Sequence, residues 1–222
     1  MQVLGNTYFM IGPNGQEAER VPSIPEYPEE PAEFLIRNLP LLPKGKVLDV
    51  AMGNGRNAVF LARNGFHVEG VDISQEAVAA ALHAAQKAGV SIQARIADLE
   101  ADFTILEQTY DVIICFHYLH RPLIPLLKQG LRRNGMIMYE TYIIDQARFG
   151  KPRNPDHLLR HNELLELFQG FRCLRYHEGI FEDRRAVAGI VAQKVYPLQK
   201  ARTKNHLSPI QSVESSREGI PG

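Results

Sequence analysis

Short apolar segments alternate with helical segments through the middle of the chain, and this alternation is what most constrains the fold. Five segments are predicted as strands, with the most apolar at 110–116: 46–51, 67–71, 91–96, 110–116 and 136–142. Three segments between them are predicted as helices: 56–63, 74–87 and 122–133. Because strands that alternate with helices are joined by right-handed crossovers, the order predicts a parallel sheet with helices on both faces.

The pattern changes after Tyr142. A loop containing Gly150 and two prolines leads to a predicted helix near 162–168 and then to two strands near 171–177 and 186–194. These two strands are joined by a short charged link and not by a crossover, so one of them must run antiparallel. The sequence therefore predicts a doubly wound, mostly parallel α/β sheet with an antiparallel strand at the end of the chain.

The length of 222 residues is typical of one domain with extensions. We expect this domain to cover 31–196, beginning with a short helix near 32–38. Residues 1–30 are punctuated by proline and predict an irregular lead-in, and the polar segment 197–222 predicts a mobile tail.

Charge and hydropathy narrow the range of partners. Lys plus Arg and Asp plus Glu number 25 each, and this balance disfavours a general nucleic-acid or membrane-surface binder. No stretch approaches the roughly 18 apolar residues of a membrane span, and no basic residue precedes Arg20 as a signal peptide would require. Cys115 and Cys173 lie in predicted strands and are expected to be buried free thiols. We therefore expect a cytoplasmic protein that acts on a small molecule, without nucleic-acid or membrane partners.

A glycine-containing loop follows the first predicted strand. Gly53 and Gly55 allow a tight turn and a close approach of the backbone to a ligand, and the helix that follows presents free amide groups there. Gly53-x-Gly55-x-x-Ala58 also fits a dinucleotide fingerprint. However, Asp49 precedes the loop, and its carboxylate suits an ammonium or sulfonium group and would repel a pyrophosphate.

Two further carboxylates lie where the second and third strands end. Asp72 is placed to accept hydrogen bonds from both hydroxyls of an unphosphorylated ribose. Asp98 is placed to accept one from an adenine amino group. Asp111 opens the fourth strand at the opposite edge of the sheet, so a structural role is expected for it.

The segment Val47–Ala58, followed by Asp72, Asp98 and the strand at 110–116, resembles the ordered motifs of class I S-adenosylmethionine-dependent methyltransferases. The resemblance covers about 45–195, and within the family it is greatest to the small tellurite-resistance-type enzymes. It implies a Rossmann-like fold of seven strands with the last one antiparallel. The chain departs from the family at Ala51, where a glycine is usual, but alanine is small enough to keep the turn.

The resemblance also implies the cofactor, S-adenosylmethionine, and a role for each matching position. Asp49 and the Gly53–Gly55 loop would hold the methionine part, Asp72 the ribose, Asp98 with Leu99 the adenine, and Phe116 and His117 would flank the methyl group. Ala51 and Ile73 are also expected to belong to the cofactor site.

The acceptor side is less defined, because methyl transfer mainly requires alignment and needs a general base only if the acceptor loses a proton. His117 is a candidate base or orienting group, and Glu140 ends the fifth predicted strand at the same edge. The basic loop at 148–161 is predicted to cover the pocket and to hold an anionic acceptor, with a partly buried Arg160 as the strongest candidate. His117 and His120 lack further ligands to complete a metal site, so no metal is expected.

These observations predict an enzyme that transfers a methyl group from S-adenosylmethionine to a small-molecule acceptor. Two alternatives stay open: a nucleotide-dependent oxidoreductase that uses the same glycine loop, and a non-catalytic S-adenosylmethionine-binding protein.

Overall fold

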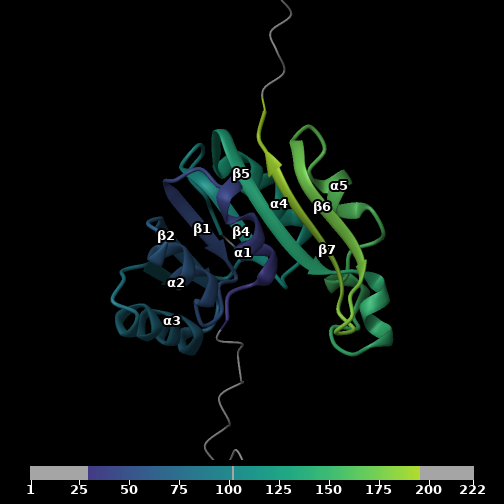
Figure 1. Ribbon diagram of the computed structural model, residues 1–222, viewed down its shortest axis with the longest axis horizontal. Coiled ribbons are helices and arrows are strands. Elements are labelled where there is room, and N and C mark those ends of the chain that lie inside the picture. The colour runs from purple at the N-terminus through teal and green to yellow at the C-terminus, as the bar shows by residue number, and fades with distance from the viewer. Residues whose placement is uncertain (1–29, 102, 196–222) are drawn as a thin grey trace, which may run out of the picture.

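A computed structural model describes residues 30–101 and 103–195 of the chain. The predicted tail at 197–222 and almost all of the predicted lead-in at 1–30 lie outside the described residues. The described part forms one sheet with helices against both of its faces (Figure 1).

The sheet has seven strands: β1 (Lys46–Val50), β2 (His67–Asp72), β3 (Gln93–Ile96), β4 (Tyr110–Phe116), β5 (Leu131–Tyr142), β6 (Arg172–Ile180) and β7 (Ala186–Gln193). Their spatial order is β3-β2-β1-β4-β5-β7-β6. The pairs among β1 to β5 are parallel, whereas β7 pairs antiparallel with both β5 and β6. The predicted fold class is confirmed, including the antiparallel orientation of the last strand.

The five α-helices are α1 (Glu33–Asn38), α2 (Arg56–Arg63), α3 (Gln75–Lys87), α4 (Ile124–Gly130) and α5 (Glu163–Leu167). Two buried clusters divide them between the faces of the sheet. Side chains of α1, α2 and α3 pack with Val47, Val112 and Ile114, whereas those of α4 and α5 pack with Leu48 and Ile113. Because neighbouring strand residues point to opposite faces, both faces of the central strands are apolar and buried.

One predicted helix is shorter than the sequence indicates. The segment predicted as helical at 122–133 contains a 3₁₀ turn (Arg121–Leu123) and α4, and the chain enters β5 at Leu131. Leu131 is fully buried and pairs with Tyr110, and the Arg132 guanidinium donates to the Asp111 carboxylate at 2.8 Å. Strand pairing therefore overrides the helix propensity of this Leu-Arg-Arg segment.

The two cysteines differ in exposure. Cys115 is buried in the central strand β4, as predicted, but Cys173 is exposed, so the expectation of burial is wrong for the second thiol. The reason is topological: Cys173 lies on β6, the edge strand of the sheet, whose residues are mostly exposed or half-buried. Across residues 30–101 and 103–195, no helix has the length and apolar character needed to cross a membrane.

Candidate functional site

The strand order reverses between β1 and β4, and in sheets of this kind ligands bind at the carboxyl ends of the strands beside that reversal. The ends of β1, β2 and β3 lie on one side of it, and the ends of β4 and β5 on the other. The predicted cofactor and acceptor residues belong to these two sides.

Asp49 is the central residue of the first side. It lies on β1 with only 1% of its surface exposed, and its Oδ2 atom has no hydrogen-bond partner among the described residues. Burial raises the pKa of this carboxyl group from 3.8 to about 8, and the nearby Arg56 guanidinium opposes that rise. A buried carboxylate oxygen without a partner is costly, so a cationic ligand group would be stabilised beside Oδ2.

The loop after β1 adopts left-handed backbone at Ala51 (φ +53°), Gly53 (φ +56°) and Gly55 (φ +78°). A Cβ atom on Gly55 would lie 2.6 Å from the Cβ of Ala81, so glycine is needed there for α2 to pack on α3. A Cβ on Gly53 would meet nothing within 4 Å. The loop is therefore closely packed at Gly55 and open at Gly53, where a ligand can approach the backbone.

Asp72 fixes the position of this loop relative to β2. Its Oδ2 accepts a hydrogen bond from the Gly53 N–H at 2.8 Å, and its Oδ1 accepts one from the Ser74 N–H at 3.0 Å. The neighbouring Ile73 side chain is 64% exposed beside the same strand end. The structure thus brings the predicted ribose-binding residues next to the glycine loop.

The predicted adenine-binding residues follow β3. Asp98 accepts a hydrogen bond from the Glu100 N–H at 2.9 Å through its Oδ1. The Leu99 side chain is buried in the core.

Arg56, the first residue of α2, was not predicted from the sequence. Its Nη1 donates to the Glu30 carbonyl at 2.9 Å, and its Nη2 lies 3.4 Å from His117 Nδ1. It therefore connects the glycine loop with the end of β4. The signal that could have identified it is its position, because the helix dipole disfavours a cation in the first turn unless another group requires it.

His117 follows the buried Phe116 at the end of β4 and is held from several directions. Its backbone is left-handed (φ +57°), its N–H donates to the Glu140 carbonyl at 2.8 Å, and its ring stacks on Tyr142 with centroids 5.1 Å apart. Its Nε2 atom is buried without a partner among the described residues. Burial lowers the pKa of this imidazole, while the Glu140 charge opposes the change.

The Glu140 side chain is engaged away from the His117 ring. It is buried, and its Oε2 atom lies 2.9 Å from Nε2 of His177 on β6, a residue that sequence reasoning missed. The two side chains approach each other across Gly189, where a Cβ atom would lie 2.5 Å from the imidazole. Glu140 therefore lines a separate cavity of about 380 Å³ that also includes residues of α1, β6 and β7.

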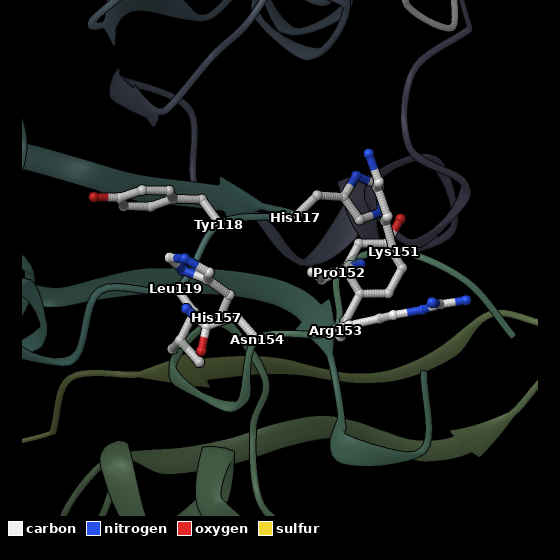
Figure 2. A pocket seen from close by; sticks show the side chains of 9 residues that line it. His117, Tyr118, Leu119, Lys151, Pro152, Arg153, Asn154 and His157 are labelled. Carbon is white, nitrogen blue, oxygen red and sulfur yellow. The ribbon is translucent and has the colours of Figure 1, made fainter. Parts of the chain in front are cut away.

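A larger pocket, of about 640 Å³, lies beyond the ends of β4 and β5 (Figure 2). One side consists of His117, Tyr118, Leu119 and Tyr142, and the other consists of the loop residues Lys151, Pro152, Arg153, Asn154 and His157. In Figure 2 the Tyr118 and His117 side chains point in opposite directions from the end of the strand. The basic loop predicted to cover a pocket thus lines this one.

The expectation of a partly buried Arg160 is wrong. Its side chain is 71% exposed and pairs with Glu163 and Glu166 at 3.4 and 3.5 Å, because the buried direction is taken by the neighbouring leucines at 158 and 159. Arg121 makes the buried contact instead, with bonds of 2.6 and 3.0 Å to the Glu163 carboxylate. It also donates to the carbonyls of Asp156 and Leu158, and so anchors the pocket loop.

Within the part of the chain that the structure describes, no cluster of three or more His, Cys, Asp or Glu side chains is arranged to hold a metal ion.

Comparison with known proteins shows which enzymes the chain is similar to. Residues 47–134 match the model of a methyltransferase domain. A curated relative, the probable S-adenosyl-L-methionine-dependent methyltransferase TehB of Haemophilus influenzae, is 24% identical over 62% of this chain and 49% of its own length. Over this segment the chain is similar to S-adenosylmethionine-dependent methyltransferases. The cofactor of these enzymes is S-adenosylmethionine, and the similarity to TehB confirms the predicted resemblance.

Other similarities agree. The ubiquinone biosynthesis O-methyltransferase of Rickettsia prowazekii is 34% identical over 45% of this chain and 41% of its own length. The crystal structure of TehB from Haemophilus influenzae superimposes with a TM-score of 0.63 at 19% identity, covering 78% of this chain and 63% of that one. This likeness shows the fold. The chain spans between 36% and 63% of the length of its curated relatives.

The described residues fit the cofactor of the family. The partnerless Oδ2 of Asp49 suits an ammonium or sulfonium group, the open space at Gly53 admits the amino-acid part, and the fixed Asp72 carboxylate suits a ribose.

Proposed function

We propose that the chain transfers the methyl group of S-adenosylmethionine to a small acceptor that binds in the pocket between the end of β4 and the loop at 151–157. The observation that carries this proposal is the buried, partnerless carboxylate oxygen of Asp49 beside the open glycine loop. A cation is the ligand group that such an oxygen stabilises most, and the cofactor of the family is cationic.

The same observation favours this proposal over a nucleotide-dependent oxidoreductase. A pyrophosphate at the glycine loop would lie near the Asp49 carboxyl group and would be compatible only with its protonated form, whereas a cationic ligand group gains the attraction of the ionised carboxylate. The acceptor pocket next to His117 supports the enzyme.

The pocket lining supports an anionic acceptor. The basic residues Lys151 and Arg153 line the pocket together with His157. Basic side chains that line a pocket stabilise carboxylates and other oxyanions by charge-assisted hydrogen bonds. We therefore propose a small anionic acceptor for this enzyme.

Ligand binding is tested by thermal unfolding with S-adenosylhomocysteine or NADH. A ligand at 100 times its Kd adds about 2.7 kcal/mol of stability, which raises Tm by a few degrees in a domain of this size. We expect S-adenosylhomocysteine to raise Tm and NADH to leave it unchanged. The opposite pattern would mean that the oxidoreductase alternative is correct.

Transfer is tested with cofactor labelled in its methyl group and a filtered extract of small molecules. We expect label in a small-molecule product. Asp72→Ala should abolish the transfer, because the Gly53 N–H of the loop and the ribose hydroxyls both lose the carboxylate that accepts their hydrogen bonds. For an acceptor found in this way, Arg153→Ala should raise KM about tenfold, as expected for the loss of one charge-assisted bond. Arg160→Ala removes an equal charge outside the pocket and should leave KM unchanged.

A further inference from the structure

The hydrogen-bonding state of His117 follows from its neighbour Arg56. A guanidinium carries only N–H donors and has no acceptor atom. Its Nη2 atom lies 3.4 Å from His117 Nδ1, so Nδ1 presents its lone pair to the guanidinium. In a neutral imidazole only one nitrogen carries the proton, and here that nitrogen is Nε2.

The charged groups around the ring agree with a neutral state. Arg56 approaches from α2, Arg185 from the segment before β7, and Glu140 from β5, while Tyr142 covers one face of the ring. The two guanidinium groups disfavour an imidazolium, and the single carboxylate favours it but lies 2.9 Å from His177. Lys151 lines the same pocket as His117 (Figure 2). Burial acts in the same direction as the cations, because it penalises the charged form.

A protonated Nε2 has a direct chemical consequence. An N–H group donates a hydrogen bond and cannot accept a proton, so His117 is unsuited to act through Nε2 as a general base. The Nε2 atom is buried without a partner among the described residues, and the residue lines the pocket that also contains Lys151 and Arg153. These surroundings suit a hydrogen-bond donor to an anionic oxygen of a ligand.

We infer that His117 is a hydrogen-bond donor that positions an acceptor entering as a carboxylate. This inference rests on the proposed function and names its substrate class. In the step it implies, a carboxylate oxygen attacks the methyl carbon and forms a C–O bond. The carbon–sulfur bond breaks and its electron pair stays on sulfur, so sulfonium and carboxylate become a neutral thioether and a neutral methyl ester. No proton moves, and His117 keeps its own throughout.

The state of His117 is tested without any acceptor, by long-range ¹H–¹⁵N correlation spectra of the labelled full chain at pH 7. The spectrum of His117→Gln assigns the resonances by their disappearance. We expect the neutral form with the proton on Nε2, and Arg56→Met should allow the proton to move to Nδ1. A proton on Nδ1 in the unsubstituted chain, or an imidazolium, overturns the inference.

The substrate class is tested by the chemistry of the labelled product from the filtered extract. Mild alkali hydrolyses a methyl ester and releases labelled methanol, whereas ethers and methylated amines keep their label. We expect alkali-labile label, and alkali-stable label overturns the carboxylate assignment. If S-adenosylhomocysteine binds but no label is transferred, the proposed enzyme activity is refuted while the spectra still decide the state of His117.

Two substitutions separate a donor from a base. His117→Gln retains an N–H group near the position of Nε2, and His117→Phe retains only the ring shape. A donor role predicts that Gln keeps kcat/KM within about threefold, while Phe lowers it by about ten- to a hundredfold, the range for one hydrogen bond to a charged group. Equal losses in both variants, with unchanged S-adenosylhomocysteine affinity, would instead indicate a base.

Discussion

Binding of S-adenosylhomocysteine is expected to release a proton at neutral pH, and Asp49 is the source. With a pKa of about 8, this carboxyl group is protonated in about nine chains of ten at pH 7. A bound ammonium group would favour the ionised form, so about 0.9 proton should leave on binding. The affinity should therefore rise with pH, by about 50-fold from pH 6 to pH 8, as the fraction of ionised Asp49 rises from about 1% to about 50%.

Isothermal titration calorimetry in two buffers with different ionisation enthalpies counts the released protons directly. Asp49→Asn keeps the shape of the side chain but cannot ionise, so it should abolish both the proton release and the pH dependence. Asp98→Asn is the matched control: Asp98 belongs to the predicted adenine side and is not among the charges that shift the Asp49 pKa, so this variant should weaken binding but leave the proton release unchanged. Affinity that stays flat between pH 6 and pH 8 in the unsubstituted chain would refute our placement of Asp49 against a cationic ligand group.

The same carboxyl group links pH to stability in the absence of ligand. Its pKa in the folded chain, about 8, lies above the ordinary value of 3.8, so its contribution to stability is full below about pH 4 and is lost as the pH rises through 8. Two pH units within that window correspond to about 2.7 kcal/mol. Urea unfolding at pH 5 and pH 7 should show this loss, and Asp49→Asn should remove it.

Two further predictions concern stability. Ala51→Gly should raise the free energy of unfolding by about 1 kcal/mol, because left-handed backbone is strained for alanine. The control Ala58→Gly, inside α2, should lower the free energy of unfolding by a similar amount. Thermal melts that show no gain in stability for Ala51→Gly would contradict the proposed strain. Hydrogen bonds from Arg121 lower the pKa of Glu163 to about 2, so the stability from this pair is present above about pH 4.5 and lost toward pH 2. Glu163→Gln should lower the free energy of unfolding by about 2 kcal/mol at pH 7 and should remove the loss of stability toward pH 2. Unfolding measured along an acid titration tests this expectation. If the variant loses stability in acid as the unsubstituted chain does, the Arg121–Glu163 pair is not the cause.

The order of elements was predictable because each central strand is buried on both faces and therefore forms an uninterrupted apolar run. Helix boundaries were predictable where a local signal exists, as at Ser74, whose side chain accepts a hydrogen bond from the Ala77 N–H. The end of the fourth helix was not, because Leu131 and Arg132 belong to β5 through pairing with Tyr110 and an ion pair with Asp111. Those partners are distant in sequence, and no local pattern reveals them.

The candidate site likewise has a part that local sequence patterns predict and a part that they do not. The proximity of the residues assigned to the cofactor side was predictable because they lie at or near strand ends in a fixed order, and the structure brings Asp49, Gly53 and Asp72 together. Their binding roles stay predictions. The acceptor side depends on the direction in which long, flexible side chains lie against the loop, and this direction is not encoded in a local pattern. The sequence places Arg160 next to two leucines, but their burial turns its side chain toward solvent, while Arg121 reaches the loop from another element.

The point where the strand order reverses also divides the chain into two consecutive pieces, one that ends with β3 and one that begins with β4. The contact between Arg56 and His117 crosses that boundary. A substitution at either residue therefore alters a contact that both pieces share, so each piece constrains the other at this point.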